Sequence, residues 1–358
     1  MTTATVDEGP SSDDGGRGFV LAHLSDPHVP HRLLTWPTAL LNKRIFGFLT
    51  WQFRRVRLHR REVLDALSRD LAGIGADHVA VTGDVVNIAL PKEFRAAAGW
   101  LHTLGTPDRV TLVPGNHDAY VAVSWQRSWR AWQEFMTSDP GADAVATAPA
   151  LPQRARRPGL DRFPIYRQRG PLALIGLSTA LPTVPGRSSG CIGPVQLERL
   201  AAHLREAATA GLFRVVLLHH PPRAPQLARY KQLSDGESFR SVIAEAGAEL
   251  VLHGHEHRFR YEELAGPLGK VPSFGVPSAS MLPPGDTPIP AGAYHLHHIR
   301  RCADKWSIET HIRTYEPAQG RFGESDRRSL TLPVQAAGPP MGPAGRASPF
   351  LEAGAAGR

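Results

Sequence analysis

The sequence predicts an α/β fold in which helices cover sheets of buried strands. Two observations carry this prediction. Short apolar runs, rich in Val, Leu and Ile and too brief for helices, alternate along the chain with helical patterns. Polar clusters follow the ends of several of these runs, where open α/β sheets place their ligand sites.

The runs are predicted to be buried strands because each is short, apolar and bounded by polar turns. In chain order they are Phe19–Leu24, His78–Thr82, Val110–Val113, Leu172–Leu177, Val215–Leu218 and Leu250–Leu252. Helices are predicted over Arg61–Leu71 and Pro194–Ala207, where leucines recur at helical spacing. Near the end, Tyr294–Arg300 and Lys305–Thr314 alternate as an antiparallel hairpin does.

Composition sets broad limits on the class of protein. A chain of 358 residues is long enough for a sizeable core, and no run approaches the ~18 apolar residues of a membrane span. The net charge of +8 comes almost entirely from Arg, so it reflects a GC-rich gene as readily as an anionic partner. The two cysteines, Cys191 and Cys302, do not make a disulfide framework.

Five polar clusters stand at the predicted strand ends: "SDPHV", "TGDVVN", "PGNHDAY", "LLHHPP" and "LHGHEHR". Carboxylates and neutral imidazoles suit borderline first-row metals such as Mn, Fe, Zn or Co. On extended backbone, side chains two residues apart point to the same side, so Asp-x-His and His-x-His can each reach one centre. The donors are too many for one tetrahedral ion, but two ions roughly 3.5–4 Å apart, clamping a phosphoryl group, would use them all. The residues concerned are Asp26, His28, Asp84, Asn116, His117, His219, His255 and His257.

The order D-x-H, G-D, G-N-H-D, H and G-H-x-H resembles the calcineurin-like metallophosphoesterase superfamily over about residues 19–315. The resemblance implies a four-layer α-β-β-α sandwich with two mixed sheets in a single domain. It also implies two divalent or mixed-valence transition-metal ions of the Mn/Fe/Zn class. By position, one metal would be bound by Asp26, His28, Asp84 and His257, and the other by Asp84, Asn116, His219 and His255, with Asp84 bridging.

The same resemblance gives His117 a catalytic role as general acid or charge stabiliser, with Asp118 as a partner for its ring. A hydroxide bridging the metals, its pKa lowered by their charge, would attack phosphorus in line with the leaving oxygen. The expected activity is hydrolysis of a small-molecule phosphodiester or phosphoanhydride. Arg223 and Arg258 directly follow ligand motifs and are candidates for contacts with the substrate phosphate.

Departures from subgroup motifs narrow the substrate class. The second motif continues as "GDVVNIAL" and not as the G-D-x-x-D-R-G of phosphoprotein phosphatases, and Asn87 stands where purple acid phosphatases have Tyr. Too little chain follows His257 for the DNA-capping domain of the recombination nucleases. The bacterial phosphodiesterase-like group remains, with cyclic-nucleotide, glycerophosphodiester and UDP-diacylglucosamine substrates. A membrane-surface lipid-linked pyrophosphatase or phosphatase and a non-catalytic, metal-stabilised regulatory module are the alternatives.

One catalytic domain is expected over residues 19–320, between disordered segments at 1–18 and 334–358, with a basic amphipathic helical insertion at about 33–61. Within it, Leu40–Arg61 has no acid and fits either an interfacial membrane element or a helix packed on the sheet with a solvated Arg face. A small phosphorylated substrate is expected, and nucleic acid is not. The N-terminus lacks a signal-peptide pattern, so a cytoplasmic protein is expected, with peripheral contact to the inner membrane face as an alternative. The oligomeric state is not predicted.

One further histidine pattern, "HLHH" at 295–298, also resembles a metal-binding sequence. Its alternation within a predicted strand favours a structural role. The isolated His102, His203 and His311 are interpreted in the same way.

Overall fold

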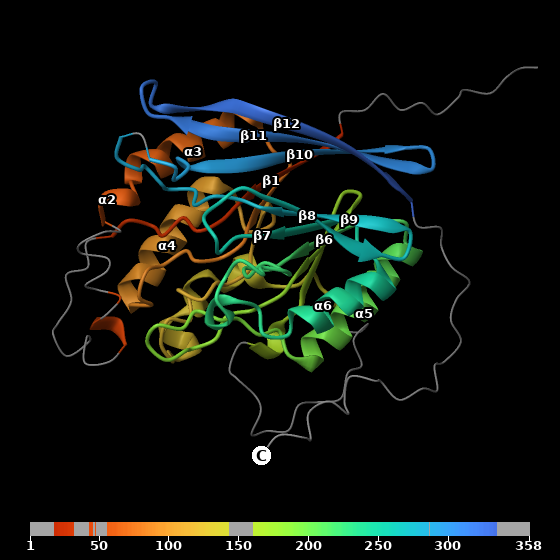
Figure 1. Ribbon diagram of the computed structural model, residues 1–358, viewed down its shortest axis with the longest axis horizontal. Helices are drawn as coiled ribbons and strands as arrows, with labels where there is room; N and C mark the ends of the chain where they lie inside the picture. The colour runs from red at the N-terminus through yellow and green to blue at the C-terminus, as the bar shows by residue number, and fades with distance from the viewer. Residues whose placement is uncertain are drawn as a thin grey trace, which may run out of the picture.

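The computed structural model describes residues 18–31, 43–45, 47, 56–142, 160–285 and 287–334 (Figure 1). Most of the predicted insertion and almost all of the two predicted disordered segments lie outside these residues. Among the described residues, no helix is both long and apolar enough to cross a bilayer.

The first sheet has six strands in the order β12-β11-β10-β1-β2-β3. Strands β1, β2 and β3 are parallel, and β10, β11 and β12 add to β1 as an antiparallel meander. The strands are β1 (Phe19–Leu24), β2 (His78–Val81), β3 (Val110–Leu112), β10 (Ala293–Cys302), β11 (Lys305–Glu316) and β12 (Arg321–Pro333). Strand β12 lies beyond the predicted domain end at residue 320, so the folded unit extends to Pro333.

The second sheet also has six strands, in the order β4-β5-β6-β7-β9-β8. Strands β5, β6, β7 and β9 are parallel, and the edge strands β4 and β8 are antiparallel to their neighbours. The strands are β4 (Ile165–Arg169), β5 (Leu172–Gly176), β6 (Phe213–Leu217), β7 (Leu250–His253), β8 (Arg260–Gly266) and β9 (Gly269–Gly275).

Helices form the outer layers (Figure 1). They are α2 (Val56–Leu58), α3 (Arg61–Ile74), α4 (Pro91–Leu104), α5 (Pro194–Thr209) and α6 (Gly236–Ala246), with 3₁₀ turns at Trp125–Arg127, Trp129–Met136, Leu160–Arg162 and Arg229–Lys231. Helix α3 shows why these sequences are helical: its leucines recur on one buried face, and Gly75 ends it in a left-handed conformation that glycine adopts without strain.

The side chains along and just after β6 pack alternately against the two neighbouring layers. Val215 and Leu217 belong to an apolar cluster that also contains residues of the first sheet, whereas Val216 and Leu218 pack into a separate cluster with residues of α5 and α6. Successive strand residues thus point alternately between the sheets and under the helices. The predicted four-layer α-β-β-α sandwich with two mixed sheets is confirmed.

Candidate metal centre

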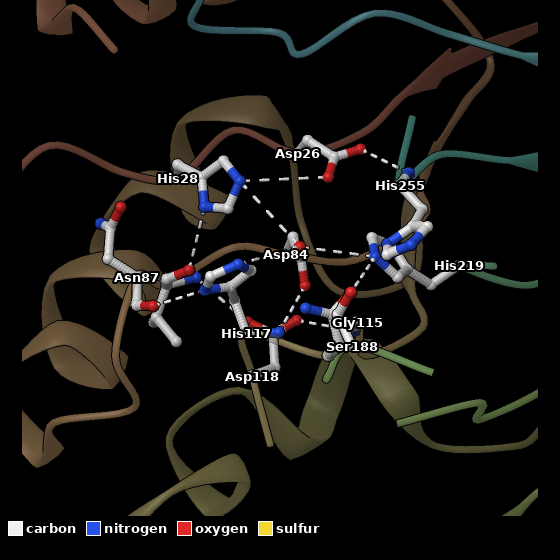
Figure 2. Close-up of polar contacts among 12 residues, drawn as sticks. Asp26, His28, Asp84, Asn87, Gly115, His117, Asp118, Ser188, His219 and His255 are labelled. Carbon is white, nitrogen blue, oxygen red and sulfur yellow. Dashed lines mark hydrogen bonds and ion pairs between the residues drawn. The ribbon is translucent and has the colours of Figure 1, made fainter. Parts of the chain in front are cut away.

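Five strand ends converge between the two sheets and carry the predicted site residues. In the first sheet, Asp26 and His28 follow β1, Asp84 follows β2, and Asn116 and His117 follow β3. The second sheet supplies His219 after β6 and both His255 and His257 after β7. Figure 2 shows Asp84 at the centre, with His28 on one side and His219 and His255 on the other.

One group of donors surrounds the Asp26 carboxylate. His257 Nε2 lies 3.0 Å from Asp26 Oδ1 and 3.4 Å from His28 Nε2. His28 Nε2 lies 4.0 Å from both Asp26 Oδ1 and Asp84 Oδ2. These are the residues expected to bind one metal.

A second group shares the Asp84 carboxylate. His219 Nε2 lies 3.4 Å from Asp84 Oδ2 and 3.1 Å from Asn116 Oδ1. One donor atom each from Asp84, His219 and His255 lie within 4.8 Å of one another, and so do donors from Asp26, His28 and Asp84. Asp84 is therefore common to two groups that could each hold a metal ion.

Outer hydrogen bonds orient the imidazole rings. His28 Nδ1 lies 3.2 Å from the Val86 carbonyl oxygen, His219 Nδ1 lies 2.7 Å from that of Thr82, and His255 Nε2 lies 3.0 Å from that of Lys231. A carbonyl accepts only from an N–H, so that nitrogen carries a proton and the opposite nitrogen is the one available to a metal. Metal-binding histidines are held in this way. In His220 both ring nitrogens have partners, Thr179 Oγ1 at 2.7 Å and the Ser188 carbonyl at 2.9 Å, in keeping with its omission from the predicted ligands.

The backbone at these strand ends is left-handed. Asp26, His28, Asp84, His255 and His257 have φ between 38° and 73°. The expectation that Asp-x-His and His-x-His lie on extended backbone is therefore wrong, and the side chains converge through sharp turns instead. Left-handed backbone is costly for residues other than glycine and clusters at functional sites. Glycines also make room for the carboxylates, because a Cβ on Gly254 would clash with Ser25 and Asp26.

Electrostatic coupling accompanies this convergence. Burial acts to raise the pKa of Asp84, but His219 and His117 outweigh it and hold that pKa well below its usual range. Burial acts to lower the pKa of His219, but Asp84 raises it to about 9. For His255 burial prevails, and its pKa falls to about 4. Buried carboxylates among imidazoles form a strongly cation-attracting site.

Asp118 was predicted to be the partner of the His117 ring, but each of the two side chains has other partners. The His117 ring places Nδ1 2.6 Å from the Asn87 carbonyl oxygen and Nε2 4.0 Å from Asp84 Oδ2. The Asp118 carboxylate accepts backbone N–H bonds from Val85, Val86 and Gly115, at 2.8–3.0 Å. Asp118 thereby fastens the loop after β3 to the loop after β2, and the ring partner seen for His117 is a backbone carbonyl.

A cleft of about 900 Å³ is lined by five of the predicted residues, Asp84, Asn116, His117, His255 and His257. Four basic side chains line it: Lys43, Arg187, Lys231 and Arg258. Lys43 Nζ donates to Thr183 Oγ1 at 2.8 Å and lies 4.4 Å from the centroid of the Tyr120 ring. Tyr120 in turn stacks on the His117 ring, with centroids 5.4 Å apart. Burial lowers the pKa of Lys43 to about 8.

Sequence reasoning assigned no role in the site to Lys43, Tyr120 or His59. The His59 ring lies 4.6 Å from the ring of His28, and its Nδ1 lies 2.7 Å from Ser280 Oγ. One nitrogen of His59 is within 4.8 Å of donors from His28 and His257. His59 begins the sequence "HRR" at the end of the basic stretch, which matches no motif. Tyr120 is the last residue of the "NHDAY" cluster, but no role was assigned to it.

Comparisons with known proteins show to which family the chain is similar. The family model described as calcineurin-like phosphoesterase matches residues 19–259. A probable cyclic nucleotide phosphodiesterase of Synechococcus sp. (strain WH7803) is 38% identical over 110 residues, which are 30% of this chain and 41% of that protein. The glycerophosphodiester phosphodiesterase GpdQ of Enterobacter lignolyticus (strain SCF1) is 26% identical over 206 residues, 57% of each chain. The chain thus spans about half the length of these curated relatives or less.

Among solved structures, a dimetal phosphatase from Danio rerio superimposes with a TM-score of 0.55 at 13% identity. The superposition covers 89% of this chain and 100% of that one. At this level of identity the likeness concerns the fold.

Proposed function

Since the chain belongs to the calcineurin-like phosphoesterase family, we propose that it is a dinuclear-metal phosphoesterase acting on a small phosphodiester or phosphoanhydride. One observation carries the proposal. The Asp84 carboxylate is shared by two groups of donors, one with Asp26 and His28 and the other with His219 and His255. A shared carboxylate is what a pair of neighbouring cations requires.

The donors fit such a pair chemically. Asp26, Asp84 and the Asn116 amide supply oxygen, and His28, His219, His255 and His257 supply nitrogen. This mixture suits Mn, Fe or Zn. When bound, two such ions supply Lewis acidity toward the phosphoryl oxygens and a nucleophilic water of lowered pKa.

Side chains of this chain then position the substrate. His117 Nε2 faces Asp84 from the cleft wall, so His117 donates a proton to the leaving oxygen or a hydrogen bond to the phosphoryl group. Tyr120, stacked on it, and the Asn87 carbonyl hold the ring in place. Lys43, Arg187, Lys231 and Arg258 offer positive charge to further anionic groups of the substrate.

The curated relatives support a diester substrate. One is named a probable cyclic nucleotide phosphodiesterase and the other a glycerophosphodiester phosphodiesterase. A basic cleft suits either kind of substrate, because both carry a phosphodiester anion.

Membrane contact through Leu40–Arg61 remains a proposal of lower rank. In the described part of this stretch, Lys43 and Gly47 line the cleft, and Arg44 donates to the carbonyls of Ile88 and Ala89. These contacts favour a role as cleft wall. An anionic-vesicle binding assay separates the two roles, because a cleft wall gives no vesicle binding in the native protein.

Turnover of a substrate panel tests the function. We expect the Mn²⁺-loaded full chain to hydrolyse bis(p-nitrophenyl) phosphate and at least one of cyclic nucleotides, glycerophosphodiesters and UDP-diacylglucosamine. Asp84→Ala should abolish turnover of every one of them, whereas Asp65→Ala on the exposed face of α3 should not. Absence of turnover with Mn²⁺, Fe²⁺ and Zn²⁺ would favour a non-catalytic, metal-stabilised module.

A further inference from the structure

Three histidines form a buried cluster that the proposed dinuclear centre does not use. His23 lies in β1, and His295 and His297 lie on one face of the neighbouring strand β10, where His23 and His295 are register partners. All three are at most 1% exposed. Phe274 of β9 packs against both His295 and His297, with ring centroids 5.7 and 5.3 Å away. The cluster is therefore enclosed between the two sheets.

Most ring nitrogens in the cluster have no hydrogen-bond partner among the residues that the structure describes. These are Nδ1 of His23, Nε2 of His297 and both ring nitrogens of His295. A buried polar atom without a partner costs about 1–3 kcal/mol, and native interiors rarely leave one. Several such atoms in one place call for a ligand that satisfies them together.

The two remaining nitrogens have hydroxyl partners. His23 Nε2 lies 2.9 Å from Thr82 Oγ1, and His297 Nδ1 lies 2.9 Å from Thr310 Oγ1. One nitrogen held from outside and the other left bare is the arrangement of metal-binding histidines.

The three rings converge. One nitrogen from each ring lies within 4.8 Å of one nitrogen of each of the other two, and the three ring centroids are 5.7, 5.9 and 6.3 Å apart. Three imidazoles bound to one ion through bonds of about 2.0–2.1 Å would place their centroids roughly 5–5.5 Å apart. A side-chain movement of about 1 Å closes the difference.

We infer that His23, His295 and His297 bind one zinc-class divalent cation, in a site separate from the proposed dinuclear centre and independent of the proposed function. Three imidazoles without carboxylate or thiolate suit Zn²⁺, Cu²⁺ or Ni²⁺, with water as a fourth ligand. Burial lowers the pKa of all three histidines, so the rings are neutral and their lone pairs available at pH 7.

The position of the ion suggests what it stabilises. It would tie β10 to β1 just before β1 delivers Asp26 to the cleft. Thr82 contacts His23 through its hydroxyl and His219 through its carbonyl, so the same ion would steady the loop that leads to Asp84. The "HLHH" pattern, interpreted above as structural, would then be structural through a metal.

Zinc stoichiometry tests the inference. The full chain carrying Asp84→Ala and His257→Ala, which empties the proposed dinuclear centre, is stripped with chelator, reloaded with Zn²⁺ and freed of excess ion. We expect about one zinc per chain by mass spectrometry, lost when His295→Gln and His297→Gln are added. The matched control adds His298→Gln and His102→Gln instead, two histidines outside the cluster, and keeps the zinc. Equal zinc content in the two four-residue variants would overturn the inference.

A second measurement needs no substitution in the cluster, in case the glutamines prevent folding. Crystals of the unmodified protein grown with Zn²⁺ should show an anomalous peak among the three rings at the zinc absorption edge. A map with zinc peaks at the dinuclear centre and none among these rings would also overturn the inference.

Discussion

At the scale of single residues, His117 offers the sharpest test of the chemistry, because its Nε2 faces Asp84 while its Nδ1 is held by a backbone carbonyl. His117→Ala should lower the turnover of a glycerophosphodiester or cyclic nucleotide by roughly 10²–10⁴-fold, the usual contribution of a general acid, because an alkoxide leaving group needs a proton. Metal content should stay unchanged, since His117 is not among the predicted ligands. His102→Ala, at an exposed position of α4, serves as the control. Turnover within a few-fold of the native protein would remove His117 from the mechanism.

His78 makes a prediction about pH. It is fully buried in β2, and burial lowers its pKa from 6.5 to about 3. Below pH 6.5 the unfolded chain therefore binds a proton that the folded protein does not, and the free energy of unfolding falls as the pH falls toward about 3. The expected slope is up to about 1.4 kcal/mol per pH unit for this one group.

Urea unfolding of metal-free protein between pH 7 and pH 4 measures this dependence. His78→Gln keeps a polar partner for Thr111 and should flatten the profile relative to the native chain, whereas His102→Gln should leave it unchanged. Parallel profiles for the native chain and His78→Gln would contradict a neutral buried His78.

At the scale of elements, Arg214 in β6 and Glu249 before β7 form a buried ion pair with two charged contacts, at 2.5 and 2.9 Å. Removing one partner leaves the other charge buried and unpaired, so Glu249→Gln should cost about 3–5 kcal/mol in urea unfolding. The double variant Arg214→Met/Glu249→Leu should lose less than either single change. Arg61→Ala breaks the exposed Arg61–Asp65 pair and should cost under about 1 kcal/mol. A Glu249→Gln loss no larger than the Arg61→Ala loss would show that the buried pair contributes little.

The elements also show what the sequence could predict. Runs such as Phe19–Leu24 and Leu172–Leu177 are almost wholly apolar because both faces of the strand are covered, so the pattern identifies them. Strand β12 escaped prediction because most of its side chains are exposed, several of them charged, and only Phe322 is buried. It belongs to the sheet through its hairpin pairing with β11, but its largely exposed side chains lack the apolar alternation that identifies a strand.

The candidate site also has parts that the sequence predicts and parts that it does not. The ligand types and their order follow from short motifs at strand ends, and the structure brings those residues together. Lys43, His59 and Tyr120 reach the cleft through tertiary packing, with no motif of their own. The turns that aim Asp26 and His28 were predicted as extended backbone, because nothing in the letters D-P-H reports a left-handed φ.

At the scale of the whole molecule, the candidate centre is built from both sheets, since β1, β2 and β3 supply part of it and β6 and β7 the rest. Cations bound there would connect the two halves of the sandwich. We therefore expect chelation to lower the thermal midpoint as well as abolish turnover. Each site should contribute about 2.7 kcal/mol when the free ion is at 100 times its Kd.

Calorimetry with Mn²⁺ and with EDTA measures this linkage. Asp84→Ala should show a much smaller difference between the two conditions, because it removes the carboxylate common to both groups. Equal thermal midpoints for the native protein in Mn²⁺ and in EDTA would show that metal binding at this centre does not stabilise the folded protein.

The left-handed turns at the strand ends place the predicted ligands where their backbone conformation opposes folding. Five of the seven non-glycine residues with positive φ in the described part of the chain are predicted ligands. At up to about 1–2 kcal/mol each, they set about 5–10 kcal/mol against folding, as much as the net stability of an ordinary domain. Glycine at these positions would remove this cost and raise the free energy of unfolding, but it would also remove the donor side chains from the site. The native chain therefore has a lower free energy of unfolding than it could have, because the metal site needs these residues. Selecting variants for stability alone would replace the predicted ligands first.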